Sequence, residues 1–242
     1  CALPILKFYL LLLSLIVGVN CAVLPICQNE LKTIFETNWA ETRLQIKEST
    51  DTCLPVKKMQ EWQTQATQLA SADYAKYISV FFENFIDTNK NSKLDKDEAV
   101  RLIDILAPNK GEELYDQFFK EVSENGDKLR EQMFKFFNYI QDEFITKVMN
   151  ANGDECISKE EFLVGQCESI DRILKLLFTL FDKNQDKVID LTEFDEVLQQ
   201  VKPFPYVTSS LGKGFSFFNK DSNNGIDMKE FQIYAVLSIA KL

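Results

Sequence analysis

The clearest hydrophobic pattern in the chain is a pair of helical stripes on either side of a polar stretch at residues 182–193. Before this stretch, apolar side chains recur at short helical intervals: Ile173, Leu174, Leu177, Phe178 and Phe181. After it, the stripe resumes with Phe194, Val197 and Leu198. This spacing puts the apolar residues on one face of an amphipathic helix, so the sequence predicts a helix, a polar loop and a second helix.

Similar patterns predict helices along most of the chain. Apolar residues flank a second polar stretch near the C-terminus: Phe215 and Phe218 before it, and Phe231, Tyr234 and Ala235 after it. Residues 28–48 and 56–86 are also predicted to be helical, with Pro55 marking the break between them, and the first has an apolar stripe made of Leu31, Ile34, Phe35 and Trp39. Residues 112–144 predict a helix, a Ser-Glu-Asn-Gly-Asp turn and a long second helix. The expected fold class is all-α.

Four polar stretches share one spacing of oxygen-bearing side chains. Each places them at positions 1, 3, 5, 9 and 12 of a twelve-residue window, with an aliphatic residue at position 8. The side chains are Asp87, Asn89, Asn91, Asp95 and Glu98; Asn150, Asn152, Asp154, Ser158 and Glu161; Asp182, Asn184, Asp186, Asp190 and Glu193; and Asn219, Asp221, Asn223, Asp227 and Glu230. The aliphatic residues are Leu94, Ile157, Ile189 and Ile226. A solvated turn has no reason to keep this spacing, whereas a hard cation that takes about six to eight oxygen ligands does.

These windows, named here loop 87, loop 150, loop 182 and loop 219 after their first residues, resemble the calcium-binding loops of the EF-hand superfamily. The resemblance covers residues 72–242 apart from a stretch in the middle. It implies helix-loop-helix units paired into lobes, short β contacts between paired loops at position 8, and Ca²⁺ as the bound cofactor. It also implies that position 7 supplies a backbone carbonyl, from Lys93, Cys156, Val188 or Gly225, and that the glutamate at position 12 binds in a bidentate manner. Loops 182 and 219 start 37 residues apart, close to the spacing of two hands in one lobe, so they are the expected pair.

The loops depart from the family pattern at position 6, where the family normally has glycine. The residues there are Ser92, Glu155, Lys187 and Asn224. A left-handed backbone at this position is expected to cost about 1 kcal/mol each for Ser, Glu and Lys, whereas Asn tolerates it best. Carboxylates at ligand positions number four in loop 182, three each in loops 87 and 219, and two in loop 150. Because ligand charge tunes affinity, loop 182 is predicted to bind calcium most tightly and loop 150 most weakly.

Two further segments leave alternatives open. Residues 123–134 form either a decayed partner loop for loop 87 or, as favoured, a plain turn between helices. The region near residue 50 is either a further, non-binding hand or, more simply, a helical hairpin that covers the first lobe. The expected organisation is a signal peptide at 1–21, an N-terminal helical segment at 22–70, a first lobe at 71–135, a second EF-hand at 136–170 and a C-terminal pair at 171–242.

The composition of the chain excludes several classes of partner and activity. The 242 residues are 45% hydrophobic and include 20 Phe, enough for a substantial core, and the net charge of −10 argues against nucleic acid or an anionic membrane surface as partner. Histidine is absent, which removes the commonest general base and transition-metal ligand. GKGFS at residues 212–216 lacks the spacing of a phosphate-binding loop. The sequence therefore does not favour an enzyme.

The N-terminus resembles a secretory signal. Lys7 precedes a twelve-residue apolar run at residues 8–19, with modest residues before Ala22 where a signal peptidase could cut, although an uncleaved anchor remains an alternative. A secreted or endomembrane-luminal location is therefore expected, where disulfides are permitted. Cleavage would leave Cys27, Cys53, Cys156 and Cys167, for which three pairings are possible. Pairing of neighbours, 27 with 53 and 156 with 167, is weakly preferred over the other pairings, and four buried free thiols are an equal alternative.

Two functions are compatible with these features. The first is a secreted or luminal protein that binds calcium ions as a buffer or store. The second is a calcium sensor that exposes a Phe-lined groove and binds a specific protein partner. The four methionines of the chain are few for a promiscuous sensor, and Phe is more commonly a core residue, so the buffer is the expected function.

Overall fold

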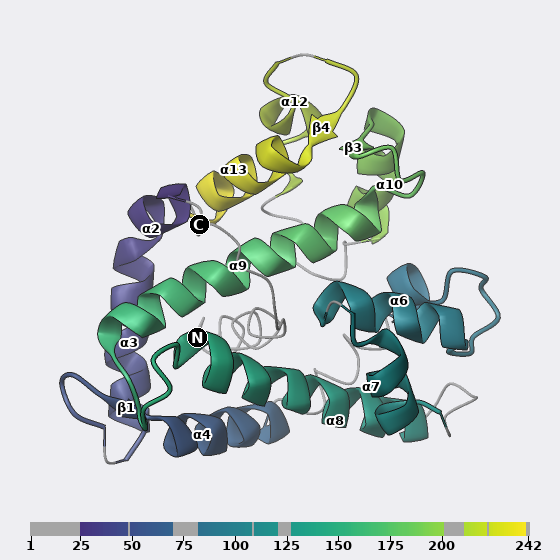
Figure 1. Cartoon of the computed structure of the whole chain (residues 1–242). Coiled ribbons are helices and arrows are strands. Elements are labelled where there is room, and N and C mark those ends of the chain that lie inside the picture. The colour runs from purple at the N-terminus through teal and green to yellow at the C-terminus, as the bar shows by residue number, and fades with distance from the viewer. Residues whose placement is uncertain are drawn as a thin grey trace.

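The computed structural model describes residues 25–47, 49–69, 82–107, 109–120, 127–200, 211–221 and 223–240. This part of the chain is mostly helical, with two small antiparallel sheets (Figure 1), as the all-α prediction expects. The proposed signal segment at 1–21 and the Ser-Glu-Asn-Gly turn at 123–126 lie outside the described residues. No helix among the residues described is long and apolar enough to cross a bilayer.

The helices and strands follow one another along the chain in this order. The α-helices are α2 (Pro25–Glu30), α3 (Lys32–Gln45), α4 (Val56–Leu69), α6 (Lys96–Leu106), α7 (Gly111–Phe118), α8 (Asp127–Phe144), α9 (Lys159–Phe181), α10 (Leu191–Gln200), α12 (Phe215–Phe218) and α13 (Met228–Ile239). Single π-helical turns, η1 (Phe82–Ile86) and η2 (Ile145–Met149), lead into loops 87 and 150. The strands are β1 (Leu54–Pro55), β2 (Cys156–Ile157), β3 (Val188–Ile189) and β4 (Ile226–Asp227). The helix predicted over 28–48 is thus divided at Leu31 into α2 and α3.

Helix α9 joins two loops as one uninterrupted helix of 23 residues (Figure 1). Its start is fixed by Ser158, whose hydroxyl accepts a hydrogen bond from the Glu161 amide in a capping box. It ends at Phe181, directly before the first residue of loop 182. Because a helix rises about 1.5 Å per residue, loop 150 and loop 182 lie at opposite ends of a rod about 34 Å long.

Three hydrophobic clusters hold the helices together. The first joins α6, α7 and α8 through residues such as Leu102, Leu114 and Phe136. The second joins α2, the start of α3, α9 from Cys167 onward, α10, α12 and α13, and includes Phe85 of η1. The third joins α3, β1, α4, the end of α8, η2, β2 and the start of α9. Each polar loop is therefore attached to a cluster by its aliphatic residue at position 8, which is Leu94 in the first, Ile189 and Ile226 in the second and Ile157 in the third.

The two sheets show which segments meet. Strands β3 and β4 pair with Val188 opposite Asp227 and Ile189 opposite Ile226, so loop 182 lies beside loop 219. Strands β1 and β2 pair with Leu54 opposite Ile157 and Pro55 opposite Cys156. The N-terminal helical hairpin therefore lies against loop 150. Loop 87 and α6 pack on α7 and α8 in the first cluster, and α4 of the hairpin also contacts α8.

Both disulfides connect distant parts of the chain. Cys27 bonds to Cys167 and Cys53 bonds to Cys156, with Cα–Cα distances of 5.8 and 5.4 Å. The preferred pairing of neighbours, and the alternative of free thiols, were therefore wrong. The physical reason is the fold: α2 packs against α9, which carries Cys167, and the β1–β2 pairing brings Cys53 to Cys156.

A buried polar cluster ties α13 to α9. Asp171, whose side chain is 2% exposed, accepts hydrogen bonds from Gln232 of α13 at 2.7 Å and from Lys175 at 2.7 Å. One turn earlier, burial raises the pKa of the Glu168 carboxyl, and the Arg172 guanidinium opposes that rise. These two hydrogen bonds satisfy the buried Asp171 carboxylate, and the bond from Gln232 fixes the position of α13 along α9.

Candidate metal centres

The glutamate at position 12 folds back over its own loop in all four cases. One carboxylate oxygen accepts backbone N–H groups from the start of the loop, and the other accepts the N–H of position 9. The first set comprises Thr88 (2.8 Å) and Asn89 (3.3 Å) to Glu98, Asn152 (3.4 Å) to Glu161, Lys183 (2.8 Å) and Asn184 (3.2 Å) to Glu193, and Lys220 (2.8 Å) and Asp221 (3.3 Å) to Glu230. The second set comprises Asp95 (3.1 Å), Ser158 (2.9 Å), Asp190 (3.1 Å) and Asp227 (3.3 Å). Each glutamate therefore spans its loop and couples the first turn of the following helix to the loop's start.

Side chains at positions 3 and 5 turn the loop backbone. In every loop an oxygen of residue 3 accepts the N–H of residue 5, and an oxygen of residue 5 accepts the N–H of residue 7. The first contacts measure 3.0, 2.9, 2.9 and 3.1 Å in loops 87, 150, 182 and 219, and the second 2.7, 2.7, 3.1 and 2.9 Å. These bonds occupy one lone pair of each oxygen and leave the other available to a ligand.

Amide groups also bring the ligand side chains of each loop together. In loop 87 the amides of Asn89 and Asn91 both donate to the same oxygen of Asp95, at 2.6 and 3.0 Å. The corresponding contacts join Asn152 to Asp154 (3.1 Å), Asn184 to Asp186 (3.2 Å) and Asn223 to Asp221 (2.7 Å). These contacts draw the oxygen-bearing side chains of each loop toward one point, while the amide oxygens keep their bonds to the loop backbone.

The first residue divides the loops into two kinds. Asp87 accepts the N–H groups of residues 91 and 92 at 3.0 and 2.9 Å, and Asp182 accepts those of residues 186 and 187 at 3.1 and 3.0 Å. Asn150 and Asn219 instead donate their amide N–H to the carbonyl oxygen of residue 5, at 2.6 and 2.9 Å. The expectation of a left-handed sixth residue is right for Ser92 (φ 59°) and Lys187 (φ 74°) and wrong for Glu155 and Asn224, which do not have positive φ.

The donor set of the loops suits a hard cation. Asn150 and Asn219 are each 7% exposed, and their side-chain oxygens are buried without any hydrogen-bond partner. An orphaned buried acceptor costs free energy unless a donor or a cation meets it. No group of three or more His, Cys, Asp or Glu side chains gathers as a metal centre within the part of the chain that the structure describes. Each loop offers carboxylate, amide and backbone oxygens, and loop 150 adds the hydroxyl of Ser158. These are the ligands that Ca²⁺ accepts.

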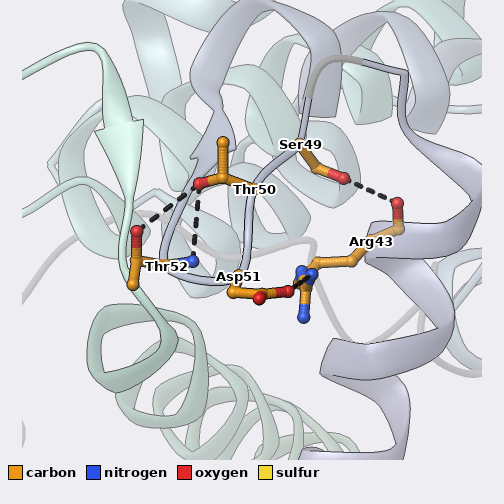
Figure 2. A network of polar contacts seen from close by, with 5 residues as sticks. All are labelled: Arg43, Ser49, Thr50, Asp51 and Thr52. Atoms are coloured by element: carbon orange, nitrogen blue, oxygen red, sulfur yellow. Dashed lines mark hydrogen bonds and ion pairs between the residues drawn. The ribbon is translucent and has the colours of Figure 1, made fainter.

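A fifth loop lies beside loop 150, in the region near residue 50 where a further, non-binding hand was the alternative prediction. The pairing of Leu54 with Ile157 gives Leu54 position 8 of a window at 47–58, named here loop 47, which has lysine at both position 1 and position 12. Figure 2 shows the polar contacts of loop 47. The Arg43 guanidinium forms an ion pair with Asp51, and the Ser49 hydroxyl donates a hydrogen bond to the Arg43 carbonyl at 2.6 Å. The hydroxyls of Thr50 and Thr52 form a hydrogen bond with each other. Lys58 pairs with Glu61, in the helix that follows, at 3.1 Å. Loop 47 therefore holds its shape through its own ion pair and hydrogen bonds.

Comparison with known proteins finds no matching family model, no similar characterised protein and no similar solved structure.

Proposed function

We propose that this protein binds calcium ions through loops 87, 150, 182 and 219, which are EF-hand loops, and that it acts as a calcium buffer or store in a secreted or luminal setting. The single observation that carries the proposal is the repeated geometry of position 12, where a glutamate reaches back to the start of its loop in all four copies. The two orphaned amide oxygens at position 1 support it, because a cation satisfies such an acceptor. The two disulfides support an oxidising compartment.

Burial of the aromatic side chains favours a buffer over a sensor. Eight phenylalanines are essentially fully buried: Phe82, Phe119, Phe136, Phe144, Phe181, Phe194, Phe218 and Phe231. A sensor must expose an apolar groove when it binds calcium, which here would mean opening clusters that these rings fill. The negative charge of the chain adds a reason for calcium to compact the fold, since each bound divalent cation reduces repulsion among the loops. The proposal includes no catalytic activity.

Calorimetric titration of the purified protein with calcium, at physiological salt and with magnesium present, tests the proposal. We expect about three or four ions per chain, because loop 150 has the fewest charged ligands. A hydrophobic dye followed in the same series should respond little. Absence of calcium binding would refute the proposal, whereas full binding with a large dye response would support the sensor and redirect work to a protein partner.

A further inference from the structure

The four loops differ in the direction of one peptide group, the one that joins positions 5 and 6. In loops 87 and 182 the N–H of residue 6 points at the carboxylate of position 1. In loops 150 and 219 the carbonyl of residue 5 points at the side chain of position 1. The C=O and N–H of a trans peptide point in opposite directions. The peptides at 154–155 and 223–224 are therefore turned over relative to those at 91–92 and 186–187.

The reversed peptide explains the orphaned oxygens. With the carbonyl facing inward, Asn150 and Asn219 must offer it their N–H, and the oxygen of the same amide is left without a partner. Turning the peptide over would present the N–H of residue 6 in place of the carbonyl. The amide oxygen could then accept that N–H with one lone pair and a cation with the other, as the carboxylates of Asp87 and Asp182 are arranged to do.

Turning the peptide over moves residue 6 into the left-handed region, as already found at Ser92 and Lys187. The ease of this change depends on the side chain. Asn adopts the left-handed region readily, whereas Glu resists it because its Cβ clashes with the backbone. Asn224 can therefore adopt the left-handed conformation easily when its peptide turns over, whereas Glu155 resists the same rotation.

On the basis of the proposed calcium binding, we infer that residue 6 sets how readily each loop takes the ion. Loops 87 and 182 are already in the receptive arrangement and bind without a backbone change. Loop 219 binds after a peptide rotation that Asn224 permits. Loop 150 binds last, because Glu155 must be forced into a left-handed conformation. Its β partner, loop 47, also has lysine in place of a ligand at positions 1 and 12.

Matched glycine substitutions at position 6 test this inference. In loop 150, Glu155→Gly removes a strain that arises only on binding, so the calcium affinity of that loop should rise about five- to tenfold. In loop 182, Lys187→Gly relieves a strain present with and without calcium. Its affinity should change less than about twofold, while the melting temperature of the calcium-free protein should rise.

Trp39 offers a local readout for loop 150. Its ring contacts that of Phe162, the residue after Glu161, with the ring centroids 5.4 Å apart. The chain has two tryptophans, so a Trp62→Phe background leaves Trp39 as the one fluorophore of this kind. Titration with calcium in this background, followed by Trp39 fluorescence, measures calcium binding to loop 150. Competition with a chelator measures the tightest calcium-binding step, which is assigned to loop 182.

The outcomes separate this inference from the proposed function. A rise in affinity for Glu155→Gly without one for Lys187→Gly supports the inference. Equal gains in both variants, or no gain in Glu155→Gly while its parent binds calcium, overturn the inference and leave the proposed function intact. A parent that binds no calcium overturns both. Should Glu155→Gly fail to fold, Asn224→Gly serves in its place: a gain in loop 219 below about threefold supports the inference, and a larger gain overturns it.

Discussion

Replacing Glu193 with Gln is expected to lower the calcium affinity of loop 182 by about a hundredfold, because ligand charge tunes affinity over several decades. Glu193 is 7% exposed, and its two carboxylate oxygens connect residues 183 and 184 to residue 190 across the loop. Glutamine keeps the shape but removes the charge and one of the two equivalent oxygens. The tightest step in a chelator-competition titration should therefore disappear, while the Trp39 signal from loop 150 should be unchanged.

Two variants serve as controls for this result. Glu196→Gln makes the same chemical change one turn further along α10, where the side chain is exposed and pairs with Lys183, so calcium affinity should change less than about twofold. Glu161→Gln should change the overall binding little, because loop 150 is already the weakest. Equal losses in Glu193→Gln and Glu161→Gln would contradict the ranking of the loops by ligand charge.

The helices and the positions of the four polar loops between them could be predicted from the sequence because both are local patterns. A helix before a loop can be recognised from the helical spacing of apolar residues such as Phe178 and Phe181. The spacing of oxygen-bearing side chains from Asp182 to Glu193 can be recognised within twelve residues. The direction of the peptide at position 6 could be predicted only in part. The left-handed residues at position 6 occur in the loops that have Asp at position 1, whose carboxylate accepts the N–H of residue 6. The conformation therefore depends on two positions of one loop together, not on residue 6 alone.

The role of the N-terminal hairpin could not be found by a search for ligands, because loop 47 has oxygen-bearing side chains at positions 3 and 5, Ser49 and Asp51, but not at positions 1, 9 and 12. Lys47 and Lys58 stand where ligand oxygens would be, so the segment carries no ladder. A weaker signal was present: aligning Leu54 with Ile157 at position 8 also aligns Cys53 with Cys156 at position 7, and both windows are followed by a helix from position 10. The hairpin depends on contacts with residues about a hundred positions later, which local patterns do not encode.

Removing the Cys27–Cys167 disulfide is expected to lower the free energy of unfolding by about 5 kcal/mol, since closing so long a loop in the unfolded chain removes much of its entropy. The two cysteines are separated by 140 residues and are 0% and 1% exposed, at the contact between α2 and α9. Substituting both with Ala avoids placing a polar group in the second cluster. Chemical denaturation of the calcium-free variant and of the parent measures the difference.

Treatment with a reductant is the control for this prediction. Reductant added to the parent should lower its free energy of unfolding by more than the Cys27→Ala, Cys167→Ala substitution does. The reason is that the Cys53–Cys156 bond, with a separation of 103 residues, is reduced as well. Adding it to the variant should remove only that second contribution. A loss below about 1 kcal/mol in the variant would show that the covalent bond does not limit the unfolded chain as the entropy model requires. Peptide mapping that found Cys27 bonded to Cys53 would show, more directly, that α2 is not attached to α9, because one thiol cannot serve both bonds.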